Sequence, residues 1–159
     1  FRIPQQRLAA AAASLPGMAF VLGGWDSQQP GTGGVILNDI ACIMQQHTQQ
    51  AQDSSGNGGT PIQWTWDDQV NLGLPTSRLV AVPISNSTIL IHNHRCTDSV
   101  MLLTVTTNGD RTTTDQDHST MEDAISWQVT RQPTTGVAPS PRGLHAATFV
   151  PPNRVVIFG

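Results

Sequence analysis

Three side chains in one short stretch have the chemistry to bind a metal ion: His92, His94 and Cys96. Alternate residues of a strand point to the same face, so the two imidazoles would lie side by side. Imidazole with thiolate suits zinc or copper, but a closed zinc site needs four ligands and this stretch offers three. The favoured interpretation is that these residues end a strand and begin a turn. No metal or other cofactor is expected.

Other residue patterns give little indication of catalysis. Asp115, Asp117 and His118 lie in a stretch rich in threonine and aspartate, which is more typical of a solvated loop than of a metal site. The chain contains no lysine and no tyrosine, which excludes Schiff-base lysine chemistry, P-loop phosphate binding and tyrosyl roles within this segment. No Gly-x-Ser-x-Gly turn is present either. The sequence predicts no catalytic residue.

Length and charge narrow the class of protein further. The 159 residues fit one ordinary domain. Charged residues make up 12%, the net charge is −3, and the eight arginines are dispersed, which argues against a polybasic nucleic-acid binder. No apolar run is long enough for a transmembrane helix, so no membrane insertion is expected. Two cysteines without a disulfide framework, and no recognisable signal peptide, favour a cytoplasmic location.

Short apolar segments that could form strands recur along the whole chain. Each is four to eight residues long and is bounded by Gly, Pro, Asn, Asp or Ser, the pattern of an all-β fold. The segments are 8–15, 18–22, 40–44, 62–66, 79–82, 88–91, 100–105, 124–129, 144–150 and 155–158. The polar stretches 45–60 and 106–123 are expected to be loops.

An internal repeat organises these strands. Three arginines, Arg7, Arg78 and Arg142, each precede a pair of strands, and the second strand ends 16, 14 and 17 residues later at Gly23, His92 and Gly159. Downstream, Asn38-Asp39 matches Thr97-Asp98, and Trp64 matches Trp127. The near-equal spacing predicts a repeated four-stranded unit.

These motifs resemble the kelch repeat, the four-stranded blade of a β-propeller. Residues 139–159 match the family pattern best, whereas His92-Asn93 stands where Gly-Gly is usual. The resemblance implies a partial kelch-type propeller of antiparallel blades: blade 1 at about 7–68, blade 2 at about 78–129, and the first half of blade 3 at about 142–159. Propellers close with about 4–8 blades, so the remaining blades would come from the same chain or a larger assembly.

The resemblance also implies a function. Kelch proteins use the loops at one rim for protein–protein recognition, so we expect a binding module or scaffold rather than an enzyme. The rim residues expected to contact a partner are Arg7, Trp25, Asp26, Arg78, His94, Arg95 and Arg142. Arginine binds carboxylates in a bidentate manner, which suits an acidic partner segment.

Alternatives stay open at this stage. The arginines could instead bond blade carbonyls, Asp39 or Asp98. The two roles are evenly balanced for Arg78, and the structural role is favoured for Arg142. The chain could also be the propeller portion of a larger enzyme, such as a kelch-containing oxidase, or a purely architectural blade set. Copper radical oxidases of this class use tyrosine ligands, which this segment cannot supply.

Overall fold

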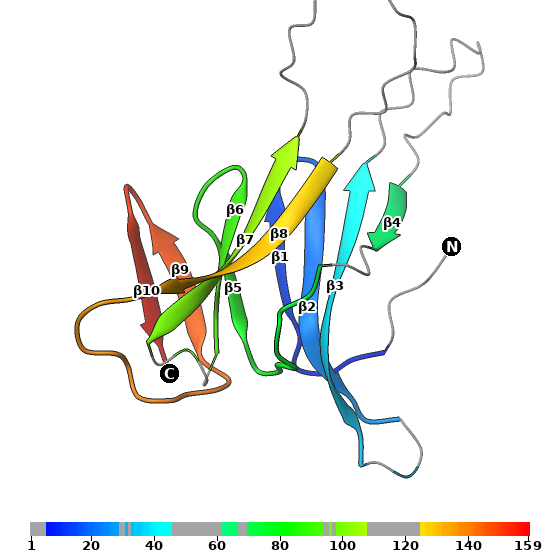
Figure 1. Cartoon of the computed structure of the whole chain (residues 1–159), viewed down its shortest axis with the longest axis horizontal. Coiled ribbons are helices and arrows are strands. Elements are labelled where there is room, and N and C mark those ends of the chain that lie inside the picture. Colours follow the sequence, from blue (N-terminus) through cyan, green and yellow to red (C-terminus); the bar gives the residue numbers. More distant parts are fainter. Residues whose placement is uncertain are drawn as a thin grey trace, which may run out of the picture.

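The computed structural model describes residues 6–28, 31, 33–45, 62–66, 70–93, 96, 98–107 and 125–159. Its strands form three antiparallel sheets, and the described residues include no helix (Figure 1). The first sheet has the order β1-β2-β3-β4, with β1 at Ala11–Leu15, β2 at Met18–Asp26, β3 at Val35–Gln45 and β4 at Ile62–Trp66. The predicted all-β class is confirmed.

The second sheet repeats this up-and-down order, and a third begins it. The second has the order β5-β6-β7-β8, with β5 at Val80–Pro83, β6 at Thr88–His92, β7 at Ser99–Thr107 and β8 at Ile125–Pro133. The third pairs β9, Ala146–Val150, with β10, Arg154–Phe158. The first strands β1, β5 and β9 neighbour one another in that order. All ten predicted strands are present, and most of 45–60 and 106–123 lies outside the described residues.

One residue with positive φ marks the start of each of the three repeats. Ala9, Arg78 and Leu144 have φ of 52°, 56° and 57°, and each lies two residues before its strand. The left-handed conformation costs an ordinary L-residue roughly 1–2 kcal/mol, so its recurrence marks a requirement of the fold. The equivalence corrects the sequence alignment: Thr76, not Arg78, occupies the place of Arg7 and Arg142.

Strand register extends this correction. Ala11 pairs with Leu22 and Val80 with His92, so His92 matches Leu22 rather than Gly23. Asn93 therefore takes the place of Gly23. The corrected spacings are 16 from Arg7 to Gly23, 17 from Thr76 to Asn93, and 17 from Arg142 to Gly159. Matching arginine to arginine had shifted the second repeat by two residues.

The predicted match of the two strand tryptophans is also shifted. Trp64 of β4 pairs with Ile43, and Trp127 of β8 pairs with Val105. In the register of the second sheet, the counterpart of Ile43 is Leu103, whose partner is Val129. Trp64 thus corresponds to Val129, two positions after Trp127. The two tryptophans lie on corresponding strands of the two sheets, β4 and β8, but at different positions along them.

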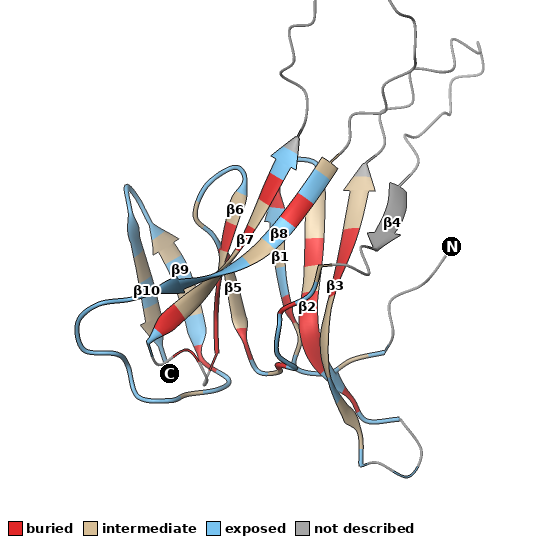
Figure 2. Cartoon of the chain, in the orientation of Figure 1, coloured by how far each residue is buried: buried red, intermediate tan, exposed pale blue. Residues whose placement is uncertain are grey.

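The hydrophobic core lies between the first and second sheets. Its fully buried side chains include Phe20, Leu22, Ile40, Ile89, Ile91 and Leu103. The Trp127 ring is buried and meets the Phe20 ring edge-on, with centroids 6.0 Å apart, so this tryptophan packs in the core. Figure 2 shows the contrast with the third sheet, whose strands contain no buried residue. Within the described residues, no helix is long and apolar enough to cross a membrane.

Candidate partner-binding groove

Arg7, the first of the expected rim arginines, is held inside the fold. Its guanidinium donates to both carboxylate oxygens of Asp39, at 2.7 and 2.8 Å, and to the Gly23 carbonyl at 2.9 Å. The side chain is 6% exposed. A bidentate pair of this kind fixes both groups in one geometry. The arrangement matches the structural alternative for this residue, because it joins the segment before β1 to β2 and β3.

Trp25 and Asp26 lie together at the end of β2. Asp26 is buried, and its carboxylate accepts the Gln28 backbone N–H at 2.9 Å, which stabilises the turn after the strand. Trp25 remains 37% exposed and forms a β-bridge with Leu8. Its indole covers Gly34, where a Cβ would lie 2.1 Å from Nε1. A side chain at position 34 would therefore collide with the indole, so this close approach requires glycine.

Arg78 and Arg142 differ in what they bond. Arg142 donates from Nη1 to the Gly159 carbonyl at 2.9 Å and from its other nitrogens to Ser140. The Arg78 side chain is exposed and makes no hydrogen bond or ion pair with any described residue. Its stem lies beside Gly143, where a Cβ would be 3.4 Å from Arg78 Cβ. Among the two, Arg78 keeps its guanidinium available for an external anion.

A groove of about 770 Å³ brings these residues together across all three sheets. It is lined by Leu8, Ala9, Trp25, Ile36, Ser77, Arg78, Pro141, Arg142, Gly143 and Leu144. Several apolar side chains here are unusually exposed: Leu144 by 77%, Leu8 by 58% and Ile36 by 42%. Contiguous exposed apolar side chains are more typical of a binding surface than of the rest of a protein's surface. The groove is therefore an apolar surface that carries a cationic group.

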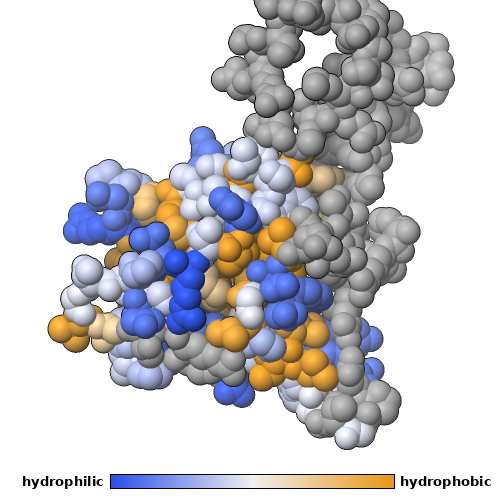
Figure 3. Space-filling view, in the orientation of Figure 1, coloured by the Kyte–Doolittle hydropathy of each residue, from blue (hydrophilic) through white to orange (hydrophobic). Residues whose placement is uncertain are grey.

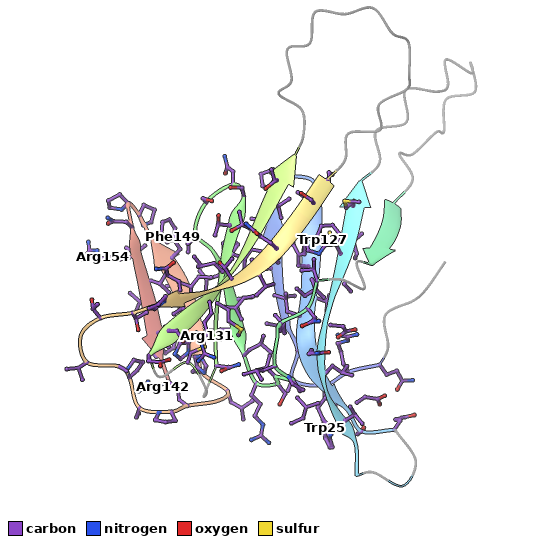
Figure 4. The ribbon with its side chains drawn as sticks, viewed as in Figure 1. Trp25, Trp127, Arg131, Arg142, Phe149 and Arg154 are labelled. Carbon is purple, nitrogen blue, oxygen red and sulfur yellow. The ribbon has the colours of Figure 1, made fainter. Side chains whose placement is uncertain are left out.

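The figures place this surface at one end of the sheets. Trp25 and Arg142 both lie at the end opposite the β5–β6 turn, whereas Trp127 lies near the start of β8, toward the other end of the sheets (Figure 4). Hydrophobic and hydrophilic side chains are interspersed on the face in view (Figure 3). A second hollow of about 480 Å³ adjoins the groove, shares Leu8 and Trp25 with it, and extends past Arg7 to Gln28. Five expected contact residues, Arg7, Trp25, Asp26, Arg78 and Arg142, thus line one or both of these two adjoining hollows.

Three further residues that the sequence analysis named are the expected contacts His94 and Arg95 and the candidate metal ligand Cys96. His94 and Arg95 lie outside the described residues. Cys96 is buried, its Sγ lies 3.6 Å from the Asn93 Oδ1, and burial raises the pKa of its thiol, which disfavours the thiolate that binds metal. The described residues contain no group of three or more His, Cys, Asp or Glu placed to hold a metal.

His92 pairs with a residue that sequence reasoning did not select. Its Nδ1 lies 3.0 Å from Nε2 of His145, and the two rings meet edge-on at 87°. Both residues are buried, at 3% and 7% exposure. The outer nitrogens, His92 Nε2 and His145 Nδ1, have no hydrogen-bond partner in the described structure. The two histidines are 53 residues apart, and only the repeat register could have suggested their proximity.

Burial controls the charge of this histidine pair. Desolvation lowers the pKa of His92, and the charges of His145 and Arg142 lower it further, while the Cys96 backbone opposes them. Desolvation and then Arg142 lower the pKa of His145. Both causes disfavour the protonated ring. The pair is therefore neutral at neutral pH, with one ring donating to the other.

A third hollow, of about 360 Å³, lies beside Leu72, Met101 and Val129 and is more apolar than the groove. Its polar neighbours already have partners: Asn71 accepts the Gly73 N–H at 2.7 Å, and Arg131 donates to Ser99 Oγ at 2.6 Å. Polar groups that fix a ligand's orientation must be free to bond it. The groove around Arg78 is the better candidate because its guanidinium meets that requirement.

No family model, curated protein or solved structure matches this chain.

Proposed function

We propose that this chain is a segment of a kelch-type β-propeller that recognises a protein partner through the groove around Arg78. The propeller interpretation is supported by two consecutive four-stranded meanders, by the adjacency of β1, β5 and β9, and by the conserved offset of the positive-φ residues. In a propeller, the first strand of each blade faces the central axis and its neighbours are the first strands of adjacent blades. The repeated register fits one repeated structural unit.

The groove's chemistry favours an acidic, partly apolar partner segment. The observation that carries this proposal is the exposed side chain of Arg78, which lies among exposed apolar side chains and whose guanidinium bonds no described residue. A carboxylate would accept two hydrogen bonds from its guanidinium. Apolar side chains on either side of that carboxylate would cover Leu8 and Leu144. Hot spots in interfaces commonly combine arginine with tryptophan, and Trp25 lies in the same groove.

Peptide selection tests this proposal. A display library of random peptides is selected on the 159-residue chain, and the affinity of an enriched peptide is measured for the parent, Arg78→Gln and Arg154→Gln. Arg154 is an exposed arginine on β10 outside the groove, so its variant is matched in charge. We expect peptides rich in Asp or Glu with apolar neighbours. Their affinity should fall about tenfold or more for Arg78→Gln, as for loss of a charged hydrogen bond, and less than twofold for Arg154→Gln.

Two outcomes would overturn the proposal. One is a selection that yields no acidic peptide. The other is an equal loss of affinity in the two arginine variants, since that would reflect net charge rather than the groove. Circular dichroism of each variant distinguishes lost binding from lost folding. Because Arg78 is exposed and bonds no described side chain, its variant is expected to fold normally.

A further inference from the structure

The wall of the groove is attached to a buried histidine. Residues 141–144 line one side of the groove, and the next residue is His145. His145 bonds His92 at the end of β6, so this contact joins the groove wall to the second sheet. A backbone movement of His145 that separates the two rings would also move residues 141–144 relative to Arg78. The geometry therefore couples the histidine pair to the shape of the groove.

The remaining attachments of this wall are weak among the described residues. At the junction between the first and second sheets, Arg78 N–H donates to the Ala9 carbonyl at 2.8 Å. The equivalent bond at the next junction would join Leu144 N–H to the Arg78 carbonyl, and it is not formed. Residues 134–141 are exposed throughout, and the strands β9 and β10 contain no buried residue. The histidine pair is thus a principal described contact of this wall.

Neutral and protonated forms of the pair differ in what they can bond. In the neutral form, one ring donates N–H to the lone pair of the other across the 3.0 Å contact. When both rings are protonated, each facing nitrogen carries a hydrogen and the bond is lost. A single added proton places a cation in a buried site beside Arg142. Either protonation step disfavours the closed arrangement.

Among the described residues, no negative charge offsets the cost of adding a proton to the histidine pair. Arg142, on the segment that leads into β9, acts on both rings. Cys96 carries a neutral thiol because its pKa is raised, and among the described residues only its backbone favours protonated His92. No carboxylate of the described residues contributes to the pKa of either histidine. A proton taken up here therefore meets positive charge rather than negative.

We propose that protonation of the His92–His145 pair displaces the wall 141–144 and releases the groove's partner, so that binding is regulated by mild acid. This inference rests on the proposed function for its consequence, but the displacement itself does not need a partner. Histidine has an ordinary pKa of about 6.5, so the change is expected as the pH falls from about 7.5 to about 5.5. Partner carboxylates, with pKa values near 4, stay charged throughout this range.

The experiment has a ligand-free arm and a binding arm. In the first, methyl NMR follows Leu144, whose side chain lines the wall, and Leu15, which is buried in the core as a reference. The variants are His145→Gln, which retains a neutral hydrogen-bonding group, and His92→Leu/His145→Leu, which replaces the pair by apolar side chains. We expect the Leu144 methyl signals of the parent chain to shift with pH while those of Leu15 do not. In both variants, the Leu144 signals should not respond between these pH values.

In the binding arm, an acidic peptide selected at pH 7.5 is titrated at both pH values. The parent should lose about tenfold or more in affinity, because one coupled proton allows up to tenfold per pH unit. The leucine double variant should lose less than twofold. A parent whose Leu144 signals do not change with pH overturns the regulation, as does a variant that responds as the parent does. A Leu144 response without any selected peptide supports the displacement and contradicts only the proposed function.

Discussion

At the two junctions between neighbouring sheets, equivalent backbone positions carry chemically different side chains: leucines at the first and histidines at the second. At the first junction, Leu22 from β2 and Leu79 from the segment before β5 are both buried members of the core. The register places His92 and His145 at the equivalent positions of the second junction. Leucine burial is insensitive to pH, whereas a histidine pair can take up protons as the pH falls into the acidic range. One repeated backbone thus supports an aliphatic contact at the first junction and a titratable contact at the second.

Burial follows the same division. The first junction is flanked by a cluster of buried aliphatic and aromatic side chains that includes Phe20 and Trp127. The third sheet contributes no side chain to that cluster, and Phe158 is 60% exposed where the first sheet has buried Leu22. Apolar burial supplies about 25 cal/mol per Å², so the two junctions should contribute unequally to stability. The following predictions test that inequality, from the largest expected effect to the smallest.

Removing an aromatic ring should be far more damaging at the first junction. Phe20 is fully buried against Trp127, so Phe20→Ala should lower the free energy of unfolding by about 3–5 kcal/mol. Phe149 in β9 is half-buried, and Phe149→Ala should cost about 1 kcal/mol. Urea denaturation followed by circular dichroism measures both. Equal losses would contradict the assignment of the core to the first junction.

The arginines at the start of the first and third repeats should differ in the same direction. Arg7 is buried and pairs with Asp39, which is 34% exposed, so Arg7→Gln should cost about 2 kcal/mol once solvent screening of Asp39 is allowed for. The contacts of Arg142 are exposed, and Arg142→Gln should change stability by about 0.5 kcal/mol or less. Urea midpoints of the two variants decide between them. A larger loss for Arg142 would reverse the expected order.

Protonation adds a comparison within one chain. Burial and positive charge depress the pKa of His92 and His145 in the folded state. Below about pH 6.5 the unfolded chain therefore binds more protons than the folded one, so the stability present above this pH is lost progressively as the pH falls toward the lowered folded-state pKa values. As the pH falls below about 6.5, the midpoint of urea unfolding should fall in the parent chain and stay level in His92→Leu/His145→Leu. A double variant with the parent's slope would show that other groups titrate.

Much of the fold was predictable from local sequence. Short apolar runs bounded by turn residues located every strand, because strand ends need residues that tolerate turns. The register within the second repeat was not predictable. Arg78 was aligned with Arg7 by residue type, but the backbone aligns Arg78 with Ala9 through a shared positive φ. A conformation that three different residue types adopt leaves no signature in the sequence.

The candidate site was predictable in part. The expectation of a rim containing Trp25, Arg78 and Arg142 agrees with the groove that they line, although partner binding itself stays a prediction. The pair of His92 and His145 could not be predicted from spacing, because it forms across 53 residues between different sheets. Sequence proximity had instead grouped His92 with His94 and Cys96 as a candidate metal site, although the end of a strand and a turn was the favoured interpretation. Contacts between sheets depend on register, and a shift of one residue exchanges one face for the other.

The smallest predicted effect concerns the backbone at the start of each repeat. Glycine adopts positive φ without a steric penalty, so Ala9→Gly, Arg78→Gly and Leu144→Gly should each leave stability unchanged or raise it by up to about 1 kcal/mol, after the extra entropy of the unfolded glycine chain is subtracted. Gly17→Ala, at φ 73° with open space around its Cβ, is the matched reverse change and should destabilise by a similar amount. Urea titrations resolve these differences when m-values stay constant.

These glycine variants also separate backbone from side chain in the groove. If Arg78→Gly keeps or gains stability yet loses the acidic peptide, the arginine is retained at a strained position for its guanidinium rather than for folding. If it loses stability by more than about 1 kcal/mol, the side chain has a structural role that its lack of described partners does not reveal. Ala9→Gly provides the internal standard, because alanine carries the same strain without a charge. The difference between these two variants therefore measures what the arginine itself contributes.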